Sequence, residues 1–104
     1  MQLDRSFLAL SHPVRRTIVE RLAHGSATVG EATRGLAVSK PAVTKHVRLL
    51  EEAGVVERRV EGRTHRLSLR ERSLADAERW LEQLWEAKFD AVERHLAKGD
   101  PDGD

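Results

Sequence analysis

The chain has 104 residues, of which 34% are charged and only 4% aromatic, and its formal net charge is +1. This length fits one domain with a modest core built mainly from Leu, Val and Ala. The absence of cysteine excludes disulfides, thiolate metal sites and redox chemistry at sulfur. No apolar run approaches the roughly 18 residues that cross a membrane, and the start lacks the apolar core of a secretory signal. We therefore expect a soluble cytoplasmic protein with no membrane partner.

The small net charge hides an uneven distribution along the chain. Residues 31–70 contain nine Lys or Arg and five acids, whereas residues 71–104 contain five Lys or Arg and ten acids. A basic middle suggests one face for a polyanion, and an acidic end suggests another face for something else. The alternative interpretation is a random scatter of solvated surface charge.

Two short helices are predicted at the N-terminus, over residues 2–10 and 14–23. Their apolar positions recur at helical spacing and are Leu3, Phe7 and Leu10 in the first helix and Val14, Ile18 and Leu22 in the second. The first helix is too short to be stable unless it packs on something. Pro13 suits the first turn of the second helix, and Arg15 is placed with other charged residues on its outer faces.

A helix-turn-helix is predicted over residues 28–53. Thr28 and Glu31 form a T-x-x-E capping-box pattern, which starts a short helix over residues 29–36. A second helix follows over residues 39–53 after a tight turn. Two helices joined in this way, the second with a cationic outer face, are typical of helix-turn-helix motifs.

The second of these helices is the predicted DNA-recognition helix. Ser39 is a good N-cap, Pro41 falls in the first turn, and Gly54 suits the C-terminal end. Lys, Thr and Arg on its outer N-terminal half suit phosphates and base edges. His46 lies on the apolar face, where it is either a packed imidazole or a phosphate or sugar contact from the helix edge. The predicted DNA contacts on this helix are Ser39, Lys40, Pro41, Thr44, Lys45, His46 and Arg48.

After Gly54 the pattern changes to β-strands, over residues 55–60 and 64–69, with residues 61–63 as the hairpin tip. This arginine-rich, two-stranded ribbon over residues 55–70 is interpreted as a wing that lies on the DNA backbone or minor groove. Arg63 at the tip and Arg59 on a strand are the predicted contacts, although only one face of a strand can look at DNA. The alternative is an edge ribbon kept soluble by charge.

The longest predicted helix covers residues 73–98 and carries a broad apolar stripe. A stripe that outruns its own domain needs a partner, and the simplest partner is a second copy of the chain. The alternative is a helix folded wholly onto its own core. The predicted dimer interface consists of Leu3, Phe7, Leu74, Leu81, Leu84, Trp85, Phe89, Val92 and Leu96. Residues 99–104 are expected to be a disordered tail, which leaves one domain over residues 1–98.

Two motifs resemble the winged helix-turn-helix domain of ArsR/SmtB-type bacterial repressors. They are L-x-x-P-x-R-x-x-I in residues 10–18 and S-x-P-A-V-T-K-H-V-x-x-L-E-x-A-G-V-V in residues 39–56, and the tip E-G-R also matches. The resemblance covers about residues 3–70. It implies a mainly α fold of five helices with a two-stranded β-wing (α+β), dimerising through the first and last helices. It also implies a cytoplasmic, nucleoid-associated repressor.

The same resemblance implies that a homodimer binds a palindromic double-stranded DNA operator, with recognition helices about one DNA turn apart, roughly 34 Å. Carried over to this chain, the operator contacts are Lys40, Pro41, Thr44 and Lys45, with Arg63 at the wing. Family members that sense metals use cysteines, or an Asp-x-His with a later His pair. This chain has neither pattern, so we expect no metal site and no cofactor.

An enzyme is not expected, because the sequence has no P-loop, no G-x-S-x-G and no carboxylate pair fixed in an evident pocket. The competing hypothesis is a winged-helix adaptor that binds protein rather than DNA. Lys40, Lys45, Arg48 and Arg63 disfavour it, because they lie where DNA would be. The sequence does not identify any small-molecule inducer.

Overall fold

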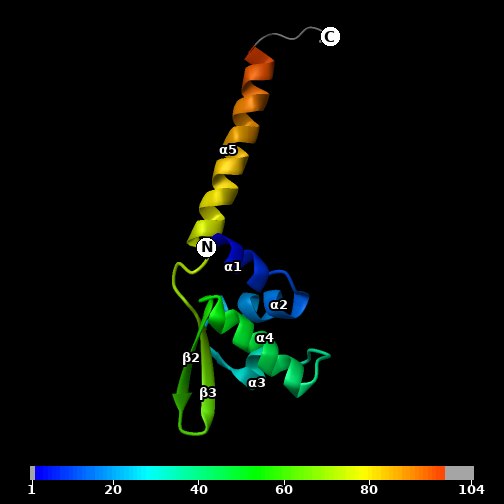
Figure 1. Cartoon of the computed structure of the whole chain (residues 1–104), viewed down its shortest axis with the longest axis vertical. Coiled ribbons are helices and arrows are strands. Elements are labelled where there is room, and N and C mark those ends of the chain that lie inside the picture. The colour runs from blue at the N-terminus through cyan, green and yellow to red at the C-terminus, as the bar shows by residue number, and fades with distance from the viewer. Residues whose placement is uncertain (1, 98–104) are drawn as a thin grey trace. The chain divides into compact units, whose positions relative to one another are not determined.

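The computed structural model describes residues 2–97, which fall into two units divided after Leu74. The first unit contains α1 (Gln2–Ala9), α2 (Pro13–Leu22), β1 (Ala27–Thr28), α3 (Val29–Ala32), α4 (Lys40–Glu52), β2 (Val56–Glu61) and β3 (Thr64–Leu69) (Figure 1). The second contains α5 (Ala75–Ala97). Five helices with a small antiparallel sheet confirm the predicted winged helix-turn-helix class. The predicted tail lies outside the described residues, and the single domain over residues 1–98 stays a prediction.

Local signals define both ends of α4, as the sequence predicts. Ser39 is the N-cap, and its Oγ accepts a hydrogen bond from the Ala42 N–H at 3.2 Å. Pro41 lies in the first turn, where its missing N–H leaves no helical bond unmade. At the other end Gly54 has a φ of 76°, a left-handed conformation that glycine adopts without strain. The helix therefore begins and ends where short-range chemistry requires.

The helix α3 is shorter than predicted: it ends at Ala32 rather than at residue 36. Both bonds of the capping box form: Thr28 Oγ1 accepts from the Glu31 N–H at 3.1 Å, and Glu31 Oε1 accepts from the Thr28 N–H at 2.9 Å. The C-terminal carbonyls bond elsewhere. Arg21 of α2 donates one Nη1 to the carbonyls of Ala32 and Arg34, at 3.2 and 2.8 Å. A side chain from another helix thus takes over where the helical ladder stops.

The sheet has three strands in the order β1-β3-β2, one more than the two-stranded ribbon predicted. The extra strand, β1, pairs Ala27 with Leu67 and Thr28 with Arg66. Two residues are too few for an alternating pattern, so the sequence gives no signal for this strand. The hairpin of β2 and β3 forms as predicted and turns at Gly62, whose φ is 65°.

One core joins α1, α2, α3, α4 and the sheet. Its fully buried side chains include Ile18, Val47, Leu50, Val55 and Leu67. Val56 and Val60 lie on the same face of β2, but Val56 is buried whereas Val60 is 59% exposed because it lies near the hairpin tip. Leu74, a predicted interface residue, is partly buried and packs against this core.

Arg15 is buried at 6% exposure, so its predicted position on an outer face of α2 is wrong. Its Nε donates to the Ala9 carbonyl at 2.9 Å. Its Nη2 donates to the Leu8 carbonyl at 3.1 Å and to Ser11 Oγ at 3.2 Å. In a continuous α-helix the Ala9 carbonyl would accept a hydrogen bond from the N–H of residue 13, but this residue is proline and has no N–H. The buried guanidinium therefore closes the C-terminal end of α1.

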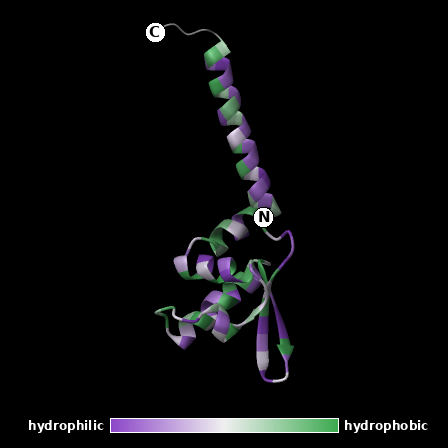
Figure 2. Cartoon of the chain, turned by 180° about the vertical axis from the view of Figure 1, so that it is seen from behind, coloured by the Kyte–Doolittle hydropathy of each residue, from purple (hydrophilic) through white to green (hydrophobic). Residues whose placement is uncertain are grey.

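The helix α5 stands as a single long helix in the second unit and carries hydrophobic and hydrophilic residues along its whole length (Figure 2). Within residues 2–97, no helix is long and apolar enough to cross a membrane.

Candidate nucleic-acid interface

The outer face of α4 presents a row of unpaired cations. Lys40, Lys45 and Arg48 are exposed, and their charged groups make no hydrogen bond or ion pair with the residues that the structure describes. Ser39, Pro41 and Thr44 are exposed beside them, and Thr44 Oγ1 donates to the Lys40 carbonyl at 3.1 Å. The predicted contact residues of this helix other than His46 therefore share an open surface, whose donors suit phosphates and base edges.

The wing carries a second group of cations, divided between its two faces. Arg63 lies at the exposed tip and is unpaired within the described part of the chain. The tip and the N-terminal half of α4 both lie toward the end of the first unit that is lowest in Figure 1. A single straight polyanion could therefore meet both.

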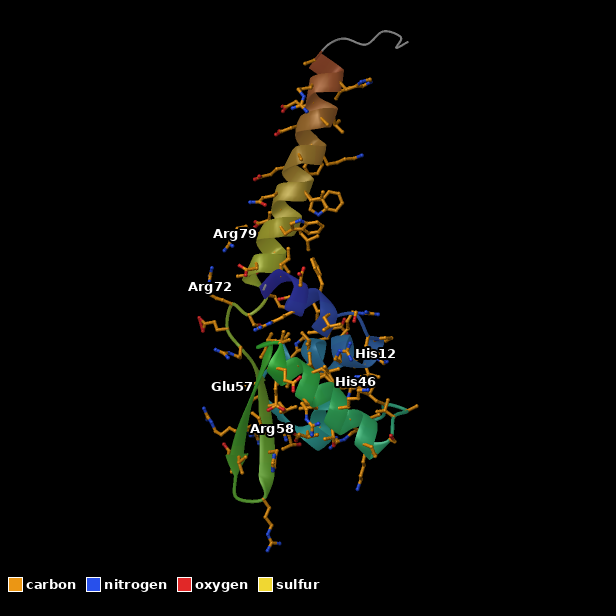
Figure 3. The ribbon with its side chains drawn as sticks, in the orientation of Figure 1. His12, His46, Glu57, Arg58, Arg72 and Arg79 are labelled. Carbon is orange, nitrogen blue, oxygen red and sulfur yellow. The ribbon has the colours of Figure 1, made fainter. Side chains whose placement is uncertain are left out.

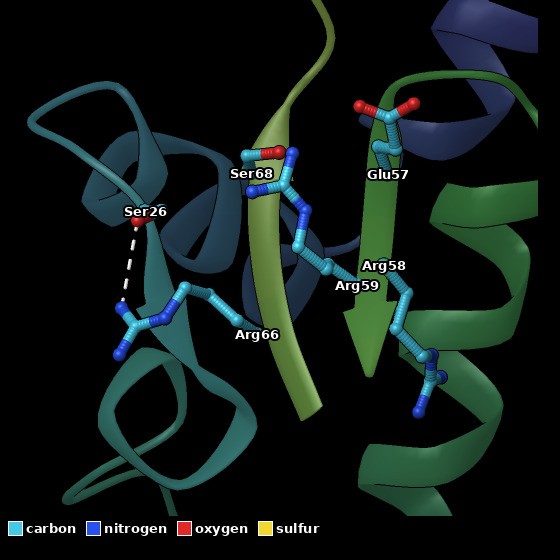
Figure 4. A pocket seen from close by; sticks show the side chains of 6 residues that line it. All are labelled: Ser26, Glu57, Arg58, Arg59, Arg66 and Ser68. Atoms are coloured by element: carbon cyan, nitrogen blue, oxygen red, sulfur yellow. Dashed lines mark hydrogen bonds between the residues drawn. The ribbon is translucent and has the colours of Figure 1, made fainter. Parts of the chain in front are cut away.

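The face of the sheet turned away from α4 mixes charges of both signs. Arg59 and Arg66 are directly paired across β2 and β3, and Arg66 also lies 3.5 Å from a carboxylate oxygen of Glu61. Figure 4 shows the shallow pocket on this face, where Arg58 and Arg59 leave β2 toward opposite sides. Glu57 lines the same pocket, and its carboxylate partly cancels the positive charge of the arginines there. The predicted DNA contact of Arg59 therefore starts from a less cationic surface than that of Arg63.

The face of the wing turned toward α4 holds a connected network that the sequence analysis did not predict. Arg58 donates through Nε and Nη2 to the two carboxylate oxygens of Glu51, at 3.0 and 2.8 Å. Its Nη1 lies 2.9 Å from His65 Nδ1. The hydrogen bond to Glu51 raises the pKa of Arg58, against the effect of burial. Strand alternation places Arg58 and His65 on the same face of the hairpin. It does not reveal Glu51, the partner of Arg58 on α4.

His46 lies at the junction of α2 and α4 rather than on the open face. Its ring is half-buried and packs against His12, with ring centroids 4.4 Å apart (Figure 3). His46 Nδ1 lies 2.9 Å from Arg15 Nη1. Burial, followed by the charges of His12, Arg15 and Lys45, lowers the pKa of His46. These contacts agree with the packed interpretation, and a DNA contact from the other ring nitrogen stays a prediction.

The second unit presents the apolar stripe predicted for self-association. Trp85, Phe89 and Leu96 are 55%, 66% and 71% exposed. The rings of Trp85 and Phe89 lie near each other, with centroids 6.4 Å apart. The remaining exposed members on α5 are Leu81, Leu84 and Val92. In α1, Phe7 is 39% exposed and Leu3 is half-buried.

The described residues contain no group of three or more His, Cys, Asp or Glu side chains that could hold a metal ion. The histidine pair is also poorly suited to one. Both Nδ1 atoms accept hydrogen bonds, His12 from the Val14 N–H at 3.1 Å and His46 from Arg15. A neutral ring that accepts at Nδ1 carries its hydrogen on Nε2, which leaves no lone pair there for a metal.

Comparisons with known proteins agree with this arrangement. A helix-turn-helix domain family matches residues 10–59. The chain is 43% identical over 82 residues to the HTH-type transcriptional regulator Rv2034 of Mycobacterium tuberculosis, covering 79% of this chain and 77% of the relative. It is 30% identical over 79 residues to the transcriptional repressor SdpR of Bacillus subtilis, covering 76% and 88%. A crystal structure of an ArsR family transcriptional regulator, 32% identical, superposes with a TM-score of 0.76 over 83% of this chain and 98% of that one.

Proposed function

The chain belongs to the ArsR/SmtB-type winged helix-turn-helix transcriptional regulators, and from that membership we propose that it is a homodimeric repressor of a palindromic operator. The N-terminal half of α4 enters the major groove, and the wing tip lies on the backbone or in the minor groove. Similarity to SdpR, which is named a repressor, supports repression rather than activation.

The observation that carries the proposal is the unpaired state of the cations on α4. On α5, by contrast, carboxylates are interspersed with the cations along the helix, and Arg79 pairs with Asp76 at 3.1 Å. Lys40, Lys45 and Arg48 have no such partners within residues 2–97. Unpaired cations on one face raise the local potential and attract a polyanion.

The proposed dimer rests on the apolar stripe of α5. At 1.5 Å per residue its 23 residues span about 35 Å. Large aromatic and aliphatic side chains along that length would form an exposed patch unusual for a monomer. A second copy of the chain covers such a stripe with a matching one, and α1 contributes Phe7 and Leu3 to the same association. Dimerisation would also supply the two recognition helices that a palindrome requires.

A winged-helix adaptor that binds protein is the competing function. It would need neither a cationic recognition face nor binding that weakens steeply with salt. The test is fluorescence anisotropy with DNA from upstream of the chain's own gene and with a scrambled duplex, each titrated with salt. Tight, salt-sensitive binding that prefers the upstream DNA supports an autoregulating repressor. Absence of binding to either duplex at low salt supports the adaptor.

One substitution makes this test specific to α4. We expect Lys45→Ala to weaken binding about tenfold and to reduce the slope of log K against log salt by about 0.9, because one phosphate contact is lost. The matched control is Arg94→Ala, which removes one exposed cation from the charged side of α5. If Lys45→Ala binds as tightly as the wild type, the assignment of α4 to DNA is wrong.

A further inference from the structure

The network of Glu51, Arg58 and His65 fixes the position and the hydrogen of one imidazole. Arg58 has two of its donor groups on the Glu51 carboxylate, at 3.0 and 2.8 Å, and a third 2.9 Å from His65 Nδ1. A guanidinium is always protonated and can only donate. His65 Nδ1 must therefore accept, and in a neutral ring the hydrogen then lies on Nε2.

His65 also borders an open groove between the start of α3 and the distal half of the wing. One side of the groove is formed by Thr28, Val29 and Gly30, and the other by Arg58, Arg63, Thr64 and His65. No carboxylate lines it, in contrast to the pocket on the opposite sheet face, which Glu57 lines. The lining residues with donor side chains are Thr28, Arg58, Arg63, Thr64 and His65. Such a set of donors suits an anion that accepts several hydrogen bonds.

We propose that this groove binds a backbone phosphate of double-stranded DNA, that His65 donates to it through Nε2, and that Glu51 and Arg58 are positioning residues for His65. The inference rests on the proposed function and extends it to a particular contact. A phosphodiester fits because Arg63, on the same groove, is itself proposed to meet the backbone at the wing tip.

Arg58 also lines the groove. Each of its three nitrogens makes one contact within the network and Glu51 offsets its charge, so we assign Arg58 to positioning His65 rather than to the phosphate. Arg58 instead connects α4 to both strands of the wing: Glu51 lies on α4, Arg58 on β2 and His65 on β3. The contact that His65 makes is therefore coupled to the position of the recognition helix.

The test measures anisotropy of a labelled, mixed-sequence duplex of about 20 base pairs at low salt, because phosphate contacts do not depend on sequence. Asparagine places its amide near the Nδ1 position and glutamine places its amide N–H₂ near the Nε2 position. We expect His65→Asn to weaken binding about tenfold and His65→Gln to stay within about twofold of wild type. Because a neutral donor releases no counterion, His65→Asn leaves the salt slope unchanged, unlike loss of a cation.

The positioning role is tested by combining substitutions. We expect Arg58→Met to weaken binding about as much as His65→Asn. The affinity of the double variant should lie within about twofold of the weaker-binding single variant. Arg66→Met is the matched control, since it removes a carboxylate-paired arginine from the other face of the same hairpin. It should change binding by less than about twofold.

The outcomes separate this inference from the proposed function. If the wild type does not bind the duplex, the proposed function is wrong. If the wild type binds and His65→Asn binds equally well, the phosphate site is wrong while the function stands. If the effects of Arg58→Met and His65→Asn multiply, Arg58 acts independently of His65 and its positioning role is wrong. His65 is exposed, so its variants are expected to fold, and circular dichroism verifies this.

Discussion

Replacement of Arg15 by methionine should destabilise the fold far more than the same change at the neighbouring arginine. Methionine keeps much of the side-chain volume but donates no hydrogen bonds. The Leu8 carbonyl would keep Ser11 as a partner, through Oγ at 2.7 Å and N–H at 3.2 Å. The Ala9 carbonyl and His46 Nδ1 would lose the donors that Arg15 provides.

The size of the effect follows from these two acceptors. Each buried acceptor left without a donor costs about 1–3 kcal/mol. Removing the guanidinium also relieves the cost of burying its charge, which offsets part of that loss. We expect a net destabilisation of about 2 kcal/mol. For a domain of this size that corresponds to a Tm lower by roughly 8–16 °C.

The assay is thermal unfolding followed by circular dichroism at one protein concentration, since association with a second copy would make Tm depend on concentration. The control is Arg16→Met. The Nη1 of Arg16 donates to the Leu10 carbonyl at 2.8 Å, but this bond is exposed. That change should cost less than about 0.5 kcal/mol. Equal Tm values for Arg15→Met and Arg16→Met would refute the argument that Arg15 closes the end of α1.

The remaining predictions concern pH and association. Burial and nearby positive groups lower the pKa of His46, so the folded state binds fewer protons at this residue than the unfolded state. Stability, measured as Tm, should therefore fall as the pH drops below about 6.5. Asparagine does not titrate, so His46→Asn should make that fall in Tm smaller. Replacing Leu81 and Trp85 together with glutamate should give monomers in sedimentation velocity and weak DNA binding, whereas Gln83→Glu should stay dimeric. A double variant that remains dimeric would place the interface elsewhere.

Much of the fold is predictable because its signals are local. The ends of α4 follow from Ser39, Pro41 and Gly54, each of which acts within one turn of itself. The hairpin follows from alternation around Gly62. The cationic face of α4 follows from helical spacing alone, and its lysines and arginine are exposed as predicted.

The parts that sequence reasoning missed depend on long-range contacts. β1 exists only because β3 lies beside it, so its two residues carry no pattern of their own. Helical spacing places Arg15 among charged residues, and only the meeting of α1, α2 and α4 shows that it is buried. The helix predicted over residues 29–36 is too long because Gly35 has a left-handed φ of 78° and Arg21, from another helix, takes the Ala32 carbonyl.

Two arginines, Arg15 and Arg58, hold α4 on opposite flanks of its buried stripe. On one flank, His46 meets Arg15, which also bonds the end of α1. On the other, Glu51 meets Arg58, which also bonds His65 of the wing. At 100° per residue, positions 46 and 51 lie about 140° apart, on either side of Val47 and Leu50. Hydrogen bonds on both flanks resist rotation of α4 about its axis, and the direction of Lys45 and Arg48 toward DNA depends on that rotation. Arg15 and Arg58, to which no DNA contact is assigned, thus orient the recognition helix.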